Sequence, residues 1–386
     1  SIHIMQKLLS VLFLSITLLV FASCSDNDEP EVPEVPQTAQ KTIFVFMPYT
    51  GDNGNLYDYF INNLNDMEKA INERGGLGDT HLIAYISKNA NTSHLIDFKY
   101  KKGSCVRDTV KTYSTADYLT VNGMSSIFSD MKQYAPANNY ALIVGSHGEG
   151  WLPKDGTART RWFGGAKYKI ETTDFAQSIK NAGIKMQFIM FDDCYMSCME
   201  VAYDLRKAAD WLIASTSEMM DFGMPYHNIL KYLLAETPDY ASMCNEFIKF
   251  YKSYRMPYGT LGVTNLAYVD EMASLMKGIN ATHTFNIDDI DNIQDLDSKH
   301  FTPTVYFDFG SYAHVLCGND NETKAQYDKL MQLLVPYKCA TEYIYSYSGR
   351  AELEVKEYSG LTISDPSINI NVVDTKEQTA WWKATH

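Results

Sequence analysis

Two short apolar runs, each ending at one reactive side chain, constrain this sequence most. The first is YALIVGSHG at residues 140–148, and the second is FIMFDDC at residues 188–194. Continuous apolar runs of this length are typical of strands buried on both faces of a parallel sheet, whose ligands bind at the carboxyl ends of the strands. We therefore expect His147 and Cys194 at the same edge of a sheet, where folding brings together a general base and a nucleophile.

The chemistry of a thiol explains why such a pair is informative. A thiol is only partly ionised at neutral pH, and its thiolate is the nucleophile, so an adjacent base activates it. His147 is the natural base, and the backbone N–H groups of Gly148 and Cys194 are candidate donors for an oxyanion hole. Asp192 and Asp193 cannot help to ionise the thiol, because nearby negative charge raises the pKa of a cysteine. We expect them to recognise substrate, orient His147 or support the structure. Taken singly, a His or a Cys at a strand end is more often structural.

Strands and helices alternate along residues 41–284, which predicts an α/β three-layer sandwich with a mostly parallel sheet. A hairpin is expected around Gly103, a helix capped by Thr115 or Asp117 and a loop at residues 148–170. We interpret residues 41–284 as a catalytic domain and residues 285–386 as a C-terminal subdomain that completes the sheet edge or the cleft wall. Other strands are expected at 41–48, 81–86, 211–217, 260–265 and 341–347, and helices at 56–74, 173–182, 198–208, 225–235, 240–254, 268–282 and 324–335.

The amino-terminal segment is predicted to be a targeting signal. Residues 5–23 combine Lys7 with an apolar stretch shorter than the roughly 20 residues of a membrane-spanning helix. The small residues before Cys24 resemble a bacterial lipoprotein signal, in which Cys24 becomes the lipidated first residue. Residues 24–40 are an acidic, Pro/Glu-rich tether similar to that of surface-exported lipoproteins of Bacteroides-like bacteria. An outer-membrane or cell-surface lipoprotein is therefore expected, and a cleaved secretory signal with a periplasmic or secreted product is the alternative.

Charge and cysteine content exclude several classes of protein. The net charge of −14 argues against nucleic-acid binding, which needs clustered Lys and Arg. The seven cysteines are too sparse for a disulfide framework, and no CxxC pair suggests zinc, so no metal site is assigned. Cys198 lies four residues after Cys194 and is interpreted as a buried structural thiol, with a ligand or a resolving thiol as the alternative. We expect a monomer.

Several motifs in a fixed order resemble one family. SHGEGW at residues 146–151 and FDDCYM at 191–196 match an apolar strand into His-Gly followed by an apolar strand into Asp-x-Cys. MEVAYDL at 199–205, GMPY at 223–226 and FDFG at 307–310 are similar to further elements of that family. Across residues 40–380 the chain thus resembles the clostripain-like cysteine peptidases of the caspase/gingipain clan.

The resemblance implies a caspase-like fold, a Cys194–His147 dyad and cleavage after Arg or Lys through an acidic S1 pocket. Asp192 matches the acid two residues before the cysteine. The acid expected directly after Ser215 is absent, and Glu218 and Asp221 are the nearest substitutes. Some relatives need calcium, but the acidic residues 288–297 lack the glycine of an EF-hand turn, and a solvated loop is the simpler interpretation.

Maturation by cleavage in relatives implies a further expectation. The loop at residues 148–170 is rich in Gly and Thr, as exposed sites of proteolysis are, and carries the self-cleavage candidates Arg159, Arg161 and Lys154. The sequence therefore indicates an endopeptidase that acts on proteins or peptides and is held at the membrane through Cys24. The alternative is an inactive caspase-like surface lipoprotein that binds peptides or glycans.

Overall fold

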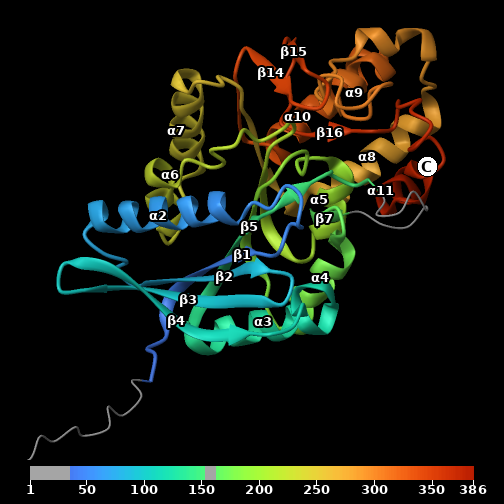
Figure 1. Ribbon diagram of the computed structural model, residues 1–386. Helices are drawn as coiled ribbons and strands as arrows, with labels where there is room; N and C mark the ends of the chain where they lie inside the picture. The colour runs from blue at the N-terminus through green and yellow to red at the C-terminus, as the bar shows by residue number, and fades with distance from the viewer. Residues whose placement is uncertain (1–34, 153–161) are drawn as a thin grey trace, which may run out of the picture. The chain divides into compact units, whose positions relative to one another are not determined.

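A twisted central sheet organises the chain (Figure 1). In the computed structural model, which describes residues 35–152 and 162–386, this sheet has nine strands in the order β13-β11-β10-β9-β5-β1-β2-β3-β4. Neighbours within its middle section are parallel, and antiparallel strands complete both edges. The predicted mostly parallel α/β fold is confirmed. The parallel strands are β10 (Ala209–Ala214), β9 (Met186–Asp192), β5 (Ala137–Gly145), β1 (Ala39–Met47) and β2 (Thr80–Asn89), and the edge strands are β3 (Thr92–Lys101), β4 (Ser104–Tyr113), β11 (Thr260–Asn265) and β13 (Tyr337–Ala340).

Apolar side chains on both faces of the sheet account for its position in the core. In β1, Ile43 and Val45 belong to one buried cluster, whereas Phe44 and Phe46 belong to the other, because successive side chains of a strand point to opposite faces. All four side chains are fully buried, and burial of such a side chain contributes about 1.5–3 kcal/mol. Both faces of the sheet must therefore be covered by helices.

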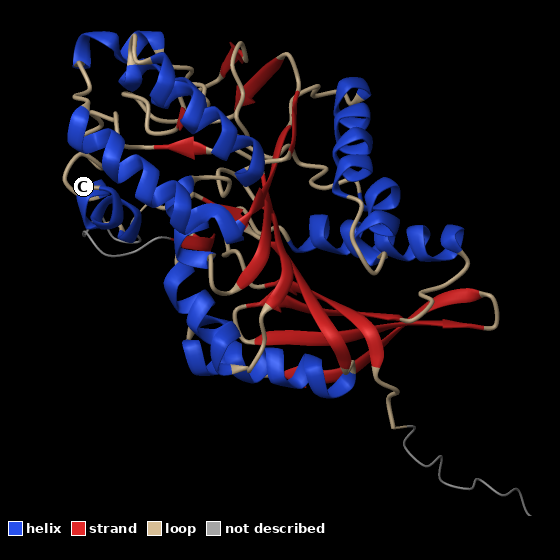
Figure 2. Ribbon diagram, turned by 180° about the vertical axis from the view of Figure 1, so that it is seen from behind, coloured by secondary structure: helices blue, strands red, loops and turns tan. Residues whose placement is uncertain are grey.

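Helices form a layer on each face of the sheet (Figure 2). One buried cluster contains apolar residues of α2 (Tyr57–Arg74), α6 (Tyr226–Leu234) and α7 (Tyr240–Ser253). The other contains apolar residues of α3 (Val121–Tyr134), α4 (Thr172–Asn181), α5 (Met199–Leu205), α8 (Val269–Thr282), α9 (Phe309–Cys317), α10 (Asn321–Leu334) and α11 (Ala380–Thr385). The result is the three-layer sandwich predicted from the alternation of strands and helices.

The expected N-cap of α3 was wrong. Thr120, not Thr115 or Asp117, caps this helix, and its hydroxyl oxygen accepts the N–H of Gly123 at 3.0 Å. Asp117 instead begins the short 3-10 helix η1 (Asp117–Leu119), which turns the chain before the helix starts. Asp117 therefore lies one turn too early to satisfy the free N–H groups at the start of α3.

The segment expected to be a loop at residues 148–170 contains strands. Its described part forms a small three-stranded sheet of β6 (His147–Gly148), β7 (Trp162–Gly165) and β8 (Tyr168–Glu171). Phe163 and Ile170, at partnered positions of β7 and β8, are buried in the core. Phe163 and Ile170 anchor this hairpin to the core, so the loop prediction was wrong for the second half of the segment. This small sheet fixes the backbone that follows the end of β5.

The C-terminal hundred residues contribute to more than one part of the fold. Strand β13 completes the central sheet, as expected for its edge, whereas the predicted strand at 341–347 is β14 (Tyr343–Ser346), paired with β15 (Ala351–Glu354). Strand β12 (Phe307–Asp308) pairs with β16 (Thr362–Ile363). Residues 37–386 form one compact unit, and the boundary drawn at residue 284 stays a prediction. No helix in the described ranges is long and apolar enough to cross a membrane. The remaining 3-10 helices are η2 (Leu266–Tyr268), η3 (Ile287–Asn292) and η4 (Lys376–Gln378).

Candidate active site

His147 and Cys194 line one cavity at the carboxyl edge of the central sheet. Gly145 of β5 pairs with Asp192 of β9, so each reactive residue follows the last paired position of its strand by two residues. The cavity has a volume of about 300 Å³, and α2 and the loop after β10 contribute its other walls. The structure therefore places the two residues where the pattern of strand ends predicts them. The residues that line the cavity include Leu56, Tyr59, Phe60, Asn63, Ser146, Met219, Met220 and Tyr347.

A backbone carbonyl orients the imidazole of His147. Its Nε2 lies 2.8 Å from the carbonyl oxygen of Gly54, which can only accept a hydrogen bond. Nε2 therefore carries the proton, and Nδ1 of the neutral ring is left with a free lone pair. A second partner that fixes the tautomer in this way is a common feature of functional histidines. Nδ1 is thus the nitrogen available to accept a proton.

Cys194 is held as a neutral thiol. Burial raises its pKa well above the ordinary value, and the negative charge of Glu218 raises it further. The N–H of Met219 points at Sγ from 3.2 Å and acts in the opposite direction, because it stabilises the thiolate. Since the net shift is upward, this thiol would need a base in order to attack, and the imidazole of His147 lines the same cavity.

Asp193 joins the ends of β5 and β9. One carboxylate oxygen accepts the N–H of Ser146 at 3.0 Å, and the other accepts the Ser146 hydroxyl at 2.5 Å. Burial raises the pKa of Asp193 well above its usual range, and the two hydrogen bonds from Ser146 lower it in part. Because Ser146 directly precedes His147, Asp193 positions the chain that carries the base. Of the tasks considered for this residue, orientation of His147 is the one the geometry favours.

The backbones beside the two reactive residues approach each other closely. A Cβ atom added to Gly148 would lie 2.4 Å from the carbonyl oxygen of Cys194, a distance that real Cβ contacts do not show. Tyr195, the next residue, has a φ of 62°, in the left-handed region that a bulky residue rarely adopts. Its N–H donates to the carbonyl oxygen of Ser217 at 3.1 Å, which holds the chain in this turn. Only glycine fits at position 148 without separating the two strand ends.

The candidate S1 acids all line the cavity, and each has a partner within the protein. Asp192 is buried, and it accepts the Met224 N–H at 3.1 Å and the Tyr226 hydroxyl at 2.8 Å. Burial raises the pKa of Asp192 to about 6, although both hydrogen bonds lower it.

The other two acids lie on the loop after β10. Glu218 accepts the N–H of Tyr347 at 2.6 Å, and burial raises its pKa. Asp221 accepts the Tyr254 hydroxyl at 2.9 Å and pairs with the guanidinium of Arg255. Asp221 has the most exposed side chain of the three, because 29% of it is accessible, compared with 9% for Glu218.

Three contributors to this site were not predicted from the sequence. Gly54 acts through its backbone, and Tyr347 follows β14, so neither position carries a local signal. His300 lies between Glu149 and Glu218 and follows, by three residues, the acidic stretch 288–297 that was interpreted as a solvated loop. Its place in sequence, away from any predicted strand or helix, gave no reason to bring it to the catalytic loops.

Some predicted residues lie outside the described part of the chain. These are the self-cleavage candidates Lys154, Arg159 and Arg161 and the lipidation candidate Cys24. Within residues 35–152 and 162–386, no group of three or more His, Cys, Asp or Glu side chains is arranged to hold a metal ion. Cys198 is fully buried and free, as expected of a structural thiol.

Comparison with known proteins gives consistent results. The model of the clostripain family matches residues 45–371. The structure of "iotapain", a secreted cysteine protease from Bacteroides thetaiotaomicron, is 38% identical with a TM-score of 0.85, and the match covers 91% of this chain and 100% of that one. A clostripain from the same species, in complex with a peptide inhibitor, is 43% identical over 57% of this chain and 96% of that one, with a TM-score of 0.55.

A third solved structure is an inactive zymogen from Parabacteroides distasonis. It is 26% identical with a TM-score of 0.77, and the match covers 91% of this chain and 99% of that one. No curated protein matches this chain.

Proposed function

Because the chain belongs to the clostripain family of cysteine peptidases, we propose that it is an endopeptidase in which Cys194 is the nucleophile and His147 the general base. The observation that carries the proposal is the shared cavity at the ends of β5 and β9. It is supported by the hydrogen bond from His147 to Gly54, which leaves Nδ1 free to accept a proton.

The reaction follows from these positions. Nδ1 of His147 takes the thiol proton as Sγ of Cys194 attacks the peptide carbonyl carbon, and negative charge develops on the carbonyl oxygen. The backbone N–H groups of Gly148 and Cys194 are the proposed donors to that oxygen. The imidazolium then gives its proton to the leaving amine, and a thioester remains. His147 next removes a proton from water, hydroxide attacks the thioester, and the thiol leaves with the proton.

Substitution of the two reactive residues tests the assignment. Cys194→Ala and His147→Ala are each expected to lower kcat by about 10⁴-fold or more with an unchanged thermal unfolding curve, and the double variant should be about as inactive as either single one. A peptidyl electrophile should label the native protein and not Cys194→Ala. Turnover retained by Cys194→Ala would contradict the mechanism. Peptide or glycan binding by a native protein that neither turns over nor is labelled would support the inactive binding module instead.

Preference for Arg or Lys at P1 is the finer part of the proposal. The solved clostripain relative holds the peptide inhibitor BTN-VLTK-AOMK, in which a lysine stands next to the AOMK group. Asp192, Glu218 and Asp221 give the corresponding cavity here an acidic lining. A charge-assisted contact to a basic side chain is worth about 1.5–3 kcal/mol, or roughly tenfold to more than a hundredfold. Asp192→Asn should therefore reduce cleavage of Arg and Lys substrates more than cleavage of neutral ones. Equal losses would make Asp192 a structural residue.

Self-cleavage after Arg159, Arg161 or Lys154 is proposed as the maturation step. The described flanks of this segment, Gly148 and β7, lie beside the catalytic residues, and a relative of this chain is described as an inactive zymogen. Purified active protein should migrate as two fragments, and Cys194→Ala should remain one chain. A variant with all three basic residues changed to Gln separates processing from activity. Full activity without any cut would exclude this step.

Attachment to the membrane through lipidated Cys24 is likewise a proposal. It is supported by the resemblance of residues 5–24 to a lipoprotein signal. Replacement of Cys24 by Ser should move the protein from the membrane fraction to the soluble fraction. The secreted alternative predicts no change, and the iotapain relative is itself described as secreted.

A further inference from the structure

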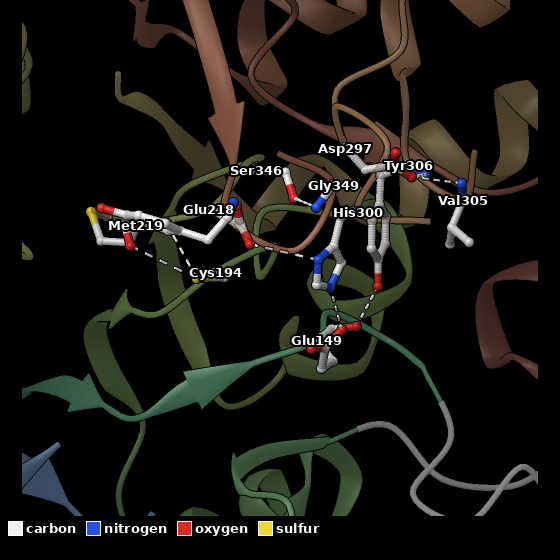
Figure 3. A network of polar contacts seen from close by, with 11 residues as sticks. Glu149, Cys194, Glu218, Met219, Asp297, His300, Val305, Tyr306, Ser346 and Gly349 are labelled. Atoms are coloured by element: carbon white, nitrogen blue, oxygen red, sulfur yellow. Dashed lines mark hydrogen bonds and ion pairs between the residues drawn. The ribbon is translucent and has the colours of Figure 1, made fainter. Parts of the chain in front are cut away.

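His300 joins the loops that follow the two catalytic strands (Figure 3). Its Nε2 lies 3.2 Å from Oε2 of Glu149, two residues after the catalytic histidine, and its Nδ1 lies 3.6 Å from Oε1 of Glu218. Only 13% of its side chain is exposed. Among the described residues, Nδ1 has no hydrogen-bond partner, and Glu218 forms an ion pair with it when the ring is protonated.

Aromatic contacts fix the imidazole of His300 in this place. Its ring stacks on Tyr195, with centroids 5.0 Å apart and planes 25° from parallel, and Tyr306 stacks on Tyr195 at 5.2 Å. The Tyr306 hydroxyl donates to the backbone carbonyl of Glu149. Because Tyr195 directly follows the nucleophile, His300 contacts the Cys194 loop, the His147 loop and the loop after β10 at once.

The charges around His300 are the same ones that act on the nucleophile. Glu218 and Glu149 both raise the pKa of Cys194, after burial, which has the largest effect. In Figure 3, Glu218 lies between Cys194 and His300. A positive charge on His300 would therefore offset the field of both glutamates at the thiol.

We propose that His300 is a positioning residue that, as an imidazolium, bridges Glu149 and Glu218 and shields the Cys194 thiol from their negative charge. The inference rests on the proposed function, since it concerns the same thiol. In this way His300, from the C-terminal part of the chain, controls the pH range in which the nucleophile ionises.

The titratable groups that face His300 are consistent with its protonation. Burial lowers the pKa of His300, but the hydrogen bond to Glu149 and the charges of Glu149, Glu218 and Asp297 raise it by more, so its net shift is upward. Burial also raises the pKa of Asp297 to about 8, so this carboxyl group contributes less negative charge near neutral pH than an ordinary aspartate. The hydroxyl of Tyr195 stays neutral, because burial raises its pKa as well. The two glutamates are therefore the main counter-charges.

The test measures the ionisation of Cys194 directly. The rate of Cys194 alkylation by iodoacetamide is followed from pH 5 to 10 in the full chain, and this needs no peptide turnover. In His300→Gln, which keeps a polar side chain but cannot carry charge, the titration should move up by about one pH unit, so alkylation at pH 7 slows by about tenfold. Glu149→Gln should move the titration of Cys194 to lower pH, and the double variant of His300→Gln and Glu149→Gln should return it toward the native pH.

Controls separate this role from a structural one. His283→Gln breaks a pair of similar exposure with Asp320, 3.0 Å away, that does not line the catalytic cavity, and it should leave the titration unchanged. A uniform loss of rate in His300→Gln with an unmoved titration would overturn the proposal, as would equal shifts in both histidine variants. If His300→Gln fails to fold, an unmoved titration in Glu149→Gln has the same consequence. Failure of the proposed peptidase function would instead appear as normal titrations without peptide cleavage.

Discussion

The contact between Gly148 and the Cys194 backbone allows a sharp prediction for Gly148→Ala. The new Cβ atom would lie 2.4 Å from the Cys194 carbonyl oxygen and 2.9 Å from Cβ of Asp193. The first distance is about 1 Å inside the 3.4 Å at which ordinary contact begins. Neither neighbour is the end of a flexible side chain, so the backbones after β5 and β9 must separate. Alanine keeps the backbone N–H of position 148, and any loss therefore reports displacement rather than a missing donor.

The expected size of the effect follows from that displacement. A shift of about 1 Å between catalytic groups costs about a hundredfold in rate, whereas overpacking of this kind costs about 1–3 kcal/mol of stability. We expect Gly148→Ala to fold, to lose about a hundredfold in kcat/KM on a peptide substrate and to unfold at a lower temperature. A folded variant with kcat/KM within about threefold of the native value would refute the reasoning.

Gly278→Ala is the matched control. Gly278 lies exposed in helix α8, and a Cβ atom there would meet nothing within 4 Å. The same chemical change should leave kcat/KM unchanged and stabilise the fold by about 1 kcal/mol, because alanine is the better helix former. Comparison of the two variants separates the close approach at the site from the general effect of replacing glycine.

The sheet could be predicted from the sequence because its signal is local. Residues such as Phe44, Val45 and Phe46 form a continuous apolar run, and a strand buried on both faces needs that composition. The short strands β7 and β8 were missed, since each is only four residues long and their buried residues Phe163 and Ile170 form no alternating pattern. Their pairing depends on a tertiary contact with the core, which a window of sequence does not contain.

The catalytic pair was predictable for the same reason, and the supporting residues were not. The ends of β5 and β9 are fixed by strand topology, so His147 and Cys194 come together whatever the loops do. Gly54, His300 and Tyr347 reach the site from segments with irregular backbone, where no periodicity relates a residue to a direction in space. The roles of Asp192 and Asp193 were also unresolved by sequence, because their partners Tyr226 and Ser146 come from distant segments of the chain.

Three further predictions concern the stability of the fold and the thiol of Cys198. Trp151→Ala should lower the free energy of unfolding, measured by chemical denaturation, by about 3–5 kcal/mol, because the residue is 2% exposed and its indole N–H donates to Ser364 Oγ at 2.7 Å. Ser364→Ala removes only the hydrogen bond and should lower it by less. Equal losses in the two variants would be inconsistent with a packing role for Trp151. Because Cys198 is fully buried, Cys198→Ala should retain most of the native kcat/KM in a peptidase assay of the purified variant. Loss of activity in a folded variant would instead show that this thiol has a functional role. Lys41 is buried in β1, where its ammonium donates to the carbonyl oxygens of Leu233 and Ala235, and burial lowers its pKa from 10.5 to about 8. The unfolded chain keeps this proton up to a higher pH than the folded chain does, so the buried ammonium lowers the free energy of unfolding below pH 8. This destabilisation is relieved as the pH rises from 8 toward 10.5, by about 3 kcal/mol in all. Between pH 8 and 9.5, the free energy of unfolding of the native protein should therefore increase relative to that of Lys41→Met. If the free energies of unfolding of the two proteins change in parallel with pH, the buried ammonium is not destabilised.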